Sequence, residues 1–259
     1  MATSHNSKLS INHYPSKSII IVYDDMTLGS DKNLWGGEFF IGTKNDFKRA
    51  AHFQYVTLQG YDKAIKEPFR CAISYLNFFK CNPDKFIDNM GVVKAGLNKN
   101  LNCYKSSSLE GLFNCVSALL KLVYNQGREG KASELLENIA AKNVQNYYKY
   151  KIKNENNMFI IELKSIINGV LRDINSNIEK SIISAKFHNT ISHITLTMSL
   201  ILSKINNVNN VILSGHIFEN QHLLKSIYEG LKNSNFEVCF DSSFYIKSKN
   251  EFIRKSLNS

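Results

Sequence analysis

The first sixty residues alternate short apolar runs with turn-forming residues. Residues 18–24 are mostly apolar and β-branched, and the run stops at Asp24 and Asp25. Short runs of this kind are typical of buried strands. Two further apolar runs, at residues 34–42 and 47–58, follow after short polar segments. Three strands with short connections predict an antiparallel meander.

After Tyr61 the apolar residues recur every three or four positions, which predicts amphipathic helices. Three serines at residues 106–108 precede the most apolar of these segments. A serine hydroxyl at this place can accept the free N–H groups of the first helical turn. Residues 147–153 and 158–163 flank an Asn-rich turn and predict a β-hairpin. The predicted helices are residues 61–79, 109–124, 129–140, 166–174 and 178–205.

A strand, a helix and a second strand are predicted at residues 211–213, 219–231 and 236–240. In such a unit the loop after the first strand lies at the carboxyl edge of the sheet, where ligands bind. We therefore expect an α/β fold with one domain. Its predicted parts are a polar leader at 1–17, the domain at 18–240 with a largely helical insertion at about 61–205, and a Lys/Asn-rich tail at 241–259.

The formal net charge is +10, but most lysines are spread singly among asparagines. A nucleic-acid-binding protein concentrates Lys and Arg on one face, so the pattern favours a compositional bias over a nucleic-acid partner. The five cysteines form no Cys-x-x-Cys pair, and reduced thiols fit this better than disulfides or a structural zinc site. No apolar run approaches the roughly 20 residues of a membrane span. We expect a cytoplasmic protein with no membrane partner.

Six short segments carry a resemblance to one family of enzymes. Trp35, Gly36, Gly37 and Glu38 match that family's Trp-Gly-Gly-Glu element. His188 and Asn189 lie in a Phe-His-Asn-Thr run that is also similar to a family element. The segments follow the family's order at residues 34–40, 67–70, 106–116, 129–132, 186–191 and 213–220. Together they resemble the hydrogenase maturation carbamoyltransferases, the HypF family, over nearly the whole chain.

The resemblance implies an actin/Hsp70-like fold, in which ATP and a divalent metal ion lie between two ribonuclease-H-like lobes. This chain would form one lobe. The family hydrolyses carbamoyl phosphate, makes carbamoyl-adenylate from ATP, and passes the carbamoyl group to the C-terminal cysteine of a hydrogenase maturation partner protein. ATP and a divalent metal ion are therefore the expected cofactors. The family's His-rich metal element lies upstream of the Asp24 position, so the resemblance also implies a separately encoded N-terminal half.

The resemblance also implies roles for single residues. Asp24 matches a metal-coordinating carboxylate, which suits a hard cation; a solvated Asp at a turn is the alternative. Glu129 matches a position near the nucleotide ribose, where a carboxylate can accept two hydroxyls. The alternative is a first-turn Glu favoured by the helix dipole. The helix that follows Gly215 could meet a phosphate at its N-terminus. The other expected nucleotide-binding residues are Gly29, Ser214 and Asn220.

Several positions depart from the family pattern where a phosphate would bind. Asp25 adds a negative charge in a stretch where the family has glycines. Glu110 and Gly111 replace a Gly-Arg pair whose Arg can hold an anion. His216 replaces a glycine and would crowd the approach of a phosphate. Two functions remain open: a carbamoyltransferase lobe that works with an N-terminal half, and a non-catalytic relative that acts as a protein-binding module.

Overall fold

The first three strands form the antiparallel meander that the sequence predicts. In the computed structural model, which describes residues 17–43, 46–82, 86–87 and 91–241, β1 (Ser18–Leu28) pairs with β2 (Leu34–Gly42), and β2 pairs with β3 (Phe47–Phe53). Alternation along β1 places Ile19, Ile21 and Tyr23 in the main core, while Ile20 packs in a smaller cluster with Phe40. All but the last residue of the predicted leader and all but the first residue of the predicted tail lie outside the described residues.

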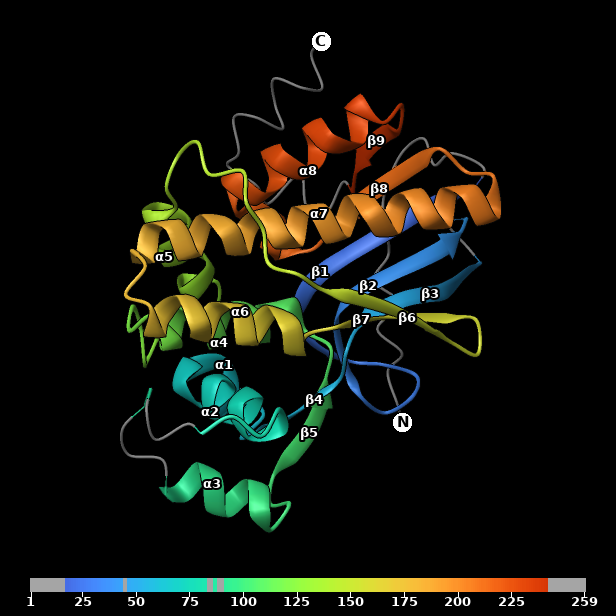
Figure 1. Cartoon of the computed structure of the whole chain (residues 1–259). Helices are drawn as coiled ribbons and strands as arrows, with labels where there is room; N and C mark the ends of the chain where they lie inside the picture. Colours follow the sequence, from blue (N-terminus) through green and yellow to red (C-terminus); the bar gives the residue numbers. More distant parts are fainter. Residues whose placement is uncertain (1–16, 44–45, 83–85, 88–90, 242–259) are drawn as a thin grey trace.

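The predicted βαβ unit is confirmed at the other side of β1. Strand β8 (Asn210–Ser214) lies parallel to β1, and β9 (Glu237–Phe240) lies parallel to β8. Strands β8 and β9 are joined by the 3₁₀ helix η2 (His216–Glu219) and by α8 (Gln221–Asn233). The resulting mixed sheet has the order β6-β7-β3-β2-β1-β8-β9, so the chain has the expected α/β fold (Figure 1).

The prediction of one strand at residues 47–58 is wrong. The run divides into β3 and β4 (Val56–Gln59), and β4 pairs with β5 (Cys103–Ser106). The division falls at Gln54, whose backbone N–H donates to Ile161 O and whose side chain accepts from Leu163 N. These two bonds tie Gln54 to the neighbouring strand and let the chain turn away from β2.

The predicted hairpin is confirmed as β6 (Lys151–Glu155) and β7 (Met158–Glu162), which extends the sheet beyond β3. Its turn residues, Asn156 and Asn157, both have positive φ, which short hairpin turns require. The segment 61–205 therefore contributes strands as well as helices. Its helices are α1 (Asp62–Lys66), α2 (Pro68–Phe78), α3 (Gly91–Asn98), α4 (Leu109–Leu119), α5 (Lys131–Ile139), α6 (Lys164–Asn175) and α7 (Lys180–Asn206).

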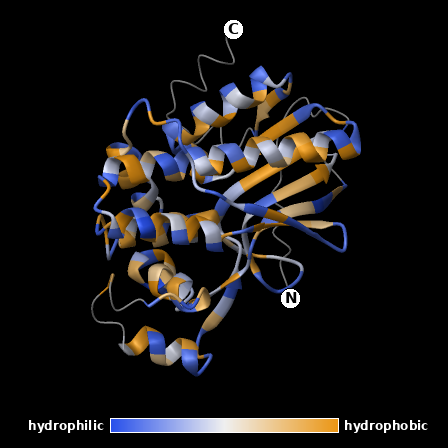
Figure 2. Ribbon diagram, in the orientation of Figure 1, coloured by the Kyte–Doolittle hydropathy of each residue, from blue (hydrophilic) through white to orange (hydrophobic). Residues whose placement is uncertain are grey.

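Helix α7 crosses one face of the sheet (Figure 1). Its 27 residues span about 40 Å at 1.5 Å per residue. The hydroxyl of the fully buried Tyr23 lies 2.7 Å from Thr195 Oγ1 on α7, and the Tyr23 ring stacks on Phe218. Figure 2 shows β1, β2 and β8 as mainly hydrophobic strands, whereas the helices carry both kinds of residue. The sheet thus contributes its apolar face to a core that α7 and η2 close.

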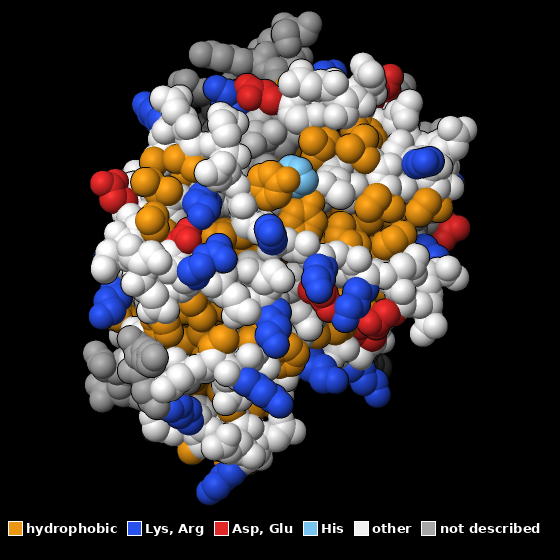
Figure 3. All heavy atoms as spheres, viewed as in Figure 1, with side chains coloured by type: hydrophobic (Ala, Val, Ile, Leu, Met, Phe, Trp, Pro, Cys, Tyr) orange, Lys and Arg blue, Asp and Glu red, His pale blue; other side chains and the backbone are white. Residues whose placement is uncertain are grey.

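The surface agrees with a dispersed positive charge. On the face in Figure 3, Lys and Arg side chains lie singly and in small groups between polar and apolar ones. The absence of a nucleic-acid partner stays a prediction. Within the described part of the chain, no helix combines the length and the apolar character needed to cross a membrane.

Candidate functional site

A β-bulge releases Asp24 from the sheet. The pairing of β1 with β2 shifts between Tyr23, which faces Gly37, and Thr27, which faces Trp35. Three residues of β1 thus lie opposite a single residue of β2, and a bulge of this kind re-aims side chains at the end of a ladder. The Asp24 side chain is 42% exposed. The strand continues to Leu28 beyond the bulge, so it does not stop at Asp24 as predicted.

The loop after β8 brings His216 to Asp24. Gly215 has φ +106°, and a Cβ atom added there would lie 2.0 Å from the carbonyl oxygen of Tyr23. Only glycine allows this conformation together with this approach to β1. The next residue, His216, places its Nδ1 2.6 Å from Asp24 Oδ1. The sequence analysis identified Asp24 and His216 separately but did not predict that they meet.

Glu110 completes a cluster with these two residues. It lies in the first turn of α4, whose N-cap Ser108 accepts a hydrogen bond from Gly111 N and donates one to the carbonyl oxygen of Asp24. A serine cap before this helix is thereby confirmed. Glu110 is fully buried; its Oε1 accepts from Gly130 N at 3.2 Å, and its Oε2 lies 3.6 Å from His216 Nε2. Strand β1, α4 and η2 thus each place one ionisable side chain in this cluster.

A cavity of about 230 Å³ opens beside the cluster, between α5 and the loop that precedes α8. Two of the predicted nucleotide-binding residues, Glu129 and Asn220, line it. Gly29, Ser214 and Gly215 are not part of its lining. The other lining residues include Arg128, Gly130, Glu134, Glu137, His216 and Glu219. The cavity therefore has an acidic rim.

The N-terminus of α8, near this cavity, is already capped within the chain. Glu137 Oε1 accepts from Gln221 N at 2.7 Å and from His222 N at 3.1 Å. Asn220 Oδ1 accepts from Leu223 N at 2.9 Å. Burial raises the pKa of Glu137 above its ordinary value. Because these first amides have acceptors, α8 does not offer them to a phosphate, and that expectation is corrected.

Two other predicted residues are used in local packing. Ser214 Oγ donates to Asp241 Oδ2 at 3.1 Å, and Asp241 is buried. A Cβ on Gly29 would lie 2.1 Å from Trp35 Cε2, so Gly29 leaves room for the indole ring. For both residues a nucleotide-binding role stays a prediction.

Comparison with known proteins identifies the family. A protein-family profile described as "Carbamoyltransferase, Kae1-like Domain, second subdomain" matches residues 20–245. The chain belongs to the HypF carbamoyltransferase family. It is 27% identical to carbamoyltransferase HypF of Synechocystis sp. over 240 residues, covering 83% of this chain and 30% of the relative. It is 26% identical to a probable carbamoyltransferase HypF of Methanocaldococcus jannaschii over 255 residues, covering 90% and 31%.

Solved HypF structures have the same fold. A full-length HypF in a phosphate- and nucleotide-bound form superimposes with a TM-score of 0.82 at 33% identity, over 87% of this chain and 30% of that one. The HypF of T. kodakarensis superimposes with a TM-score of 0.74 at 23% identity, over 88% and 32%. The chain thus corresponds to about a third of the length of these HypF proteins.

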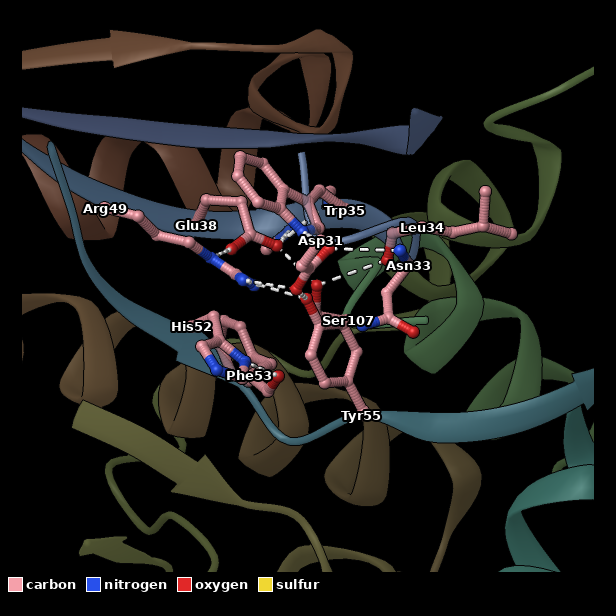
Figure 4. A network of polar contacts seen from close by, with 12 residues as sticks. Asp31, Asn33, Leu34, Trp35, Glu38, Arg49, His52, Phe53, Tyr55 and Ser107 are labelled. Atoms are coloured by element: carbon pink, nitrogen blue, oxygen red, sulfur yellow. Dashed lines mark hydrogen bonds and ion pairs between the residues drawn. The ribbon is translucent and has the colours of Figure 1, made fainter. Parts of the chain in front are cut away.

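The Trp-Gly-Gly-Glu element of the HypF family joins neighbouring parts of this chain through a network of hydrogen bonds (Figure 4). The buried Glu38 carboxylate accepts from the backbone N–H groups of Gly36 and Gly37, both at 3.2 Å, and from the Ser107 hydroxyl. Arg49 Nε lies 2.5 Å from Glu38 Oε2. Burial raises the pKa of Glu38, and Arg49 opposes that rise. This HypF element therefore ties β2 and β3 to the segment before α4.

A second polar layer surrounds Arg49 in Figure 4. The guanidinium lies 4.2 Å above the Trp35 ring and 3.3 Å from Asp31 Oδ2. Trp35 Nε1 and the Tyr55 hydroxyl donate to Asp31, at 2.8 and 2.5 Å. Although partial burial raises the pKa of Asp31, the hydrogen bonds from Tyr55, Asn33 and Trp35 prevail and hold this pKa at about 2. The turn between β1 and β2 is thereby fixed to β3.

The other HypF element, around His188, also joins parts of the fold. His188 is fully buried; its Nδ1 lies 2.8 Å from Ser184 O and its Nε2 lies 2.9 Å from Asn220 Nδ2. The backbone carbonyl requires a proton on Nδ1, so Nε2 accepts from Asn220. Asn189 Nδ2 donates to Val144 O at 2.6 Å. The hydrogen bond from Asn220 to the buried His188 thus holds Asn220 in its place in the cavity lining.

Burial lowers the pKa of His188 to about 4, from 6.5. The unfolded chain therefore binds this proton at a higher pH than the folded chain does. The stabilisation that depends on neutral His188 is present above pH 6.5 and is lost as the pH falls towards 4. We expect this residue to reduce the free energy of unfolding over that interval by on the order of 3 kcal/mol. His52, whose pKa burial also lowers to about 4, adds an effect of the same sign.

Urea denaturation of the wild type and His188→Gln at about pH 7 and about pH 5 measures this effect. The glutamine amide does not titrate, so the variant is expected to lose less stability between the two pH values. His52→Gln provides a comparison at a second buried histidine. An equal loss in the wild type and in His188→Gln would contradict the assignment.

The donor set at Asp24 does not fit a bound metal ion. The Asp24 carboxylate is paired with His216, as described above. Among the described residues, no group of three or more His, Cys, Asp or Glu side chains is arranged to hold a metal ion. His193, another histidine of α7, lies with its Nδ1 2.7 Å from the Tyr150 hydroxyl. A metal-binding role of Asp24 stays a prediction.

Proposed function

We propose that this chain binds the nucleoside part of ATP as one lobe of a carbamoyltransferase that forms carbamoyl-adenylate. The observation that carries the proposal is the position of Glu129. This residue lines the cavity, and its carboxylate has no hydrogen-bond or ion-pair partner among the described residues. A carboxylate in that state can accept both hydroxyls of a ribose. The similar HypF structure in a phosphate- and nucleotide-bound form supports nucleotide as the ligand class.

The remaining chemistry is assigned to other parts of the enzyme. The chain spans about a third of the length of its HypF relatives. The proposal also includes an N-terminal half of the enzyme that handles carbamoyl phosphate. It also includes a hydrogenase maturation partner whose C-terminal cysteine receives the carbamoyl group, in the cytoplasm.

A second candidate is a non-catalytic HypF relative that keeps the fold and a binding surface. The specific observations in its favour are the pairing of His216 with Asp24 and the capping of α8 by Glu137. Both remove groups that a triphosphate would need. Pyrophosphate release from the chain mixed with the N-terminal half separates the two candidates. Release that requires carbamoyl phosphate supports the first, and no release under any pairing supports the second.

Nucleoside binding itself is tested by calorimetry. Glu129→Ala is expected to weaken adenosine binding at least about tenfold, which is about 1.4 kcal/mol, because the ribose hydroxyls lose their acceptor. The measurement is isothermal titration of the wild type and the variant with adenosine.

The control for this titration is Glu229→Ala. Glu229 lies on α8, pairs only loosely with Lys225 at 3.8 Å, and is not part of the cavity lining. Its removal is expected to leave the affinity unchanged. A folded wild-type chain that gives no heat with millimolar adenosine would overturn the proposed ligand class.

A further inference from the structure

The imidazole of His216 lies between two carboxylates from different elements. Its Nδ1 is 2.6 Å from Asp24 Oδ1 on β1, and its Nε2 is 3.6 Å from Glu110 Oε2 on α4. The Glu110 side chain is fully buried, and its Oε2 has no hydrogen-bond partner. Two carboxylates that converge in this way repel each other unless a positive group or a donor lies between them.

We propose that the His216 side chain takes the place of a divalent cation between Asp24 and Glu110, so that the adjoining cavity binds its ligand without a metal ion. Carboxylate oxygens are the ligands that Mg²⁺ and Mn²⁺ prefer. Here two carboxylates point at a position that the imidazole fills. His216 reaches it from η2, directly after Gly215, and also lines the cavity. The claim that the ligand binds without a metal ion rests on the proposed function. The claim that His216 occupies a cation position does not.

The lining of the cavity defines the class of ligand. Four of its residues, Glu129, Glu134, Glu137 and Glu219, are acidic, and its one arginine, Arg128, is paired with Glu134. The first amides of α8 have acceptors within the chain. Repulsion by the carboxylates disfavours a polyphosphate, and their acceptor oxygens favour hydroxyl donors. The structure therefore points to an uncharged polyhydroxylated ligand such as a nucleoside, bound more tightly than its triphosphate.

His216→Gly tests the filled cation position, because it removes the imidazole and leaves both carboxylates. We expect the variant to bind Mn²⁺ at least about tenfold more tightly than the wild type, measured by the loss of the electron paramagnetic resonance signal of free Mn²⁺. The double variant His216→Gly with Asp24→Asn is expected to lose that gain. His222→Gly is the matched control, since it removes another histidine, whose ring packs edge-on against His188, and it is expected to behave like the wild type.

The outcomes are separable. A folded His216→Gly chain that binds Mn²⁺ no better than the wild type overturns the inference; His216→Ala repeats the test if the glycine variant is unfolded by circular dichroism. Adenosine binding to the wild type that requires Mg²⁺ and is abolished by EDTA also overturns it, but leaves the proposed function intact. Tight Mn²⁺ binding by His216→Gly together with no adenosine binding by the wild type supports the cation position and overturns the proposed function.

Discussion

Replacing Glu38 with alanine is expected to lower the free energy of unfolding by about 3–5 kcal/mol, because it removes the nearer and more deeply buried of the two carboxylates that pair with Arg49. The Arg49 side chain is only 10% exposed, and it lies 2.5 Å from Glu38. The substitution also removes the acceptor of Ser107 and of the Gly36 and Gly37 amides. Urea denaturation at neutral pH measures the change.

The control for Glu38→Ala is Glu229→Ala on the surface of α8. Its ion pair with Lys225 is exposed, with N···O at 3.8 Å, and such pairs contribute little to stability. We expect a change within about 0.5 kcal/mol. If Glu38→Ala lost no more stability than Glu229→Ala, the hydrogen bonds and the ion pair of Glu38 would not contribute to stability as proposed.

Gly215→Ala is expected to destabilise the fold by at least about 3 kcal/mol. The residue has φ +106°, which a side chain rarely adopts, and the new Cβ would meet the Tyr23 carbonyl oxygen at 2.0 Å. Because that oxygen belongs to β1, the loop after β8 must move away from the strand. His216 would then also move away from Asp24. Denaturation measures the loss of stability, and adenosine titration measures the effect on the cavity.

Gly127→Ala is the matched control for this backbone effect. A Cβ at Gly127 would have no neighbour within 4 Å, and its φ lies outside the left-handed range. An alanine there reduces the freedom of the unfolded chain, so we expect a change of at most about 1 kcal/mol, in the stabilising direction. Equal losses in the two alanine variants would show that close approach to β1 is not the reason for a glycine at 215.

The sequence predicts those parts of the fold that depend on local patterns. The apolar runs of β1 and β2 and the Asn-rich turn of the β6–β7 hairpin can be recognised in the sequence. Each of these elements is specified by the residue types at a few neighbouring positions. Strand β5 was missed because its residues are half exposed and its pairing with β4 is a long-range interaction. For the same reason the division between β3 and β4 was not predicted, because it depends on bonds from Gln54 to residues more than a hundred positions away.

The candidate site was predicted residue by residue but not as an arrangement. Asp24 was identified by the resemblance to the HypF family, and Gly215 by that resemblance together with its place after a predicted strand, where ligands gather. The contact of Asp24 with His216 joins residues 192 positions apart, and no local pattern encodes it. The capping of α8 by Glu137, over 84 positions, is a similar case. Nothing in the sequence distinguishes Glu137 as a cap of α8 from a solvated glutamate on its own helix.

The place of β1 in the sheet has a consequence for biosynthesis. One neighbour, β2, follows at once in the chain, but the other, β8, begins only at Asn210. A growing polypeptide therefore exposes one open edge of an Ile-rich strand until nearly all of the domain has left the ribosome. Open apolar edges pair readily with other chains and lead to aggregation. Pairing of β8 with β1 therefore does more than complete the sheet, because it also covers the strand edge that the nascent domain leaves open.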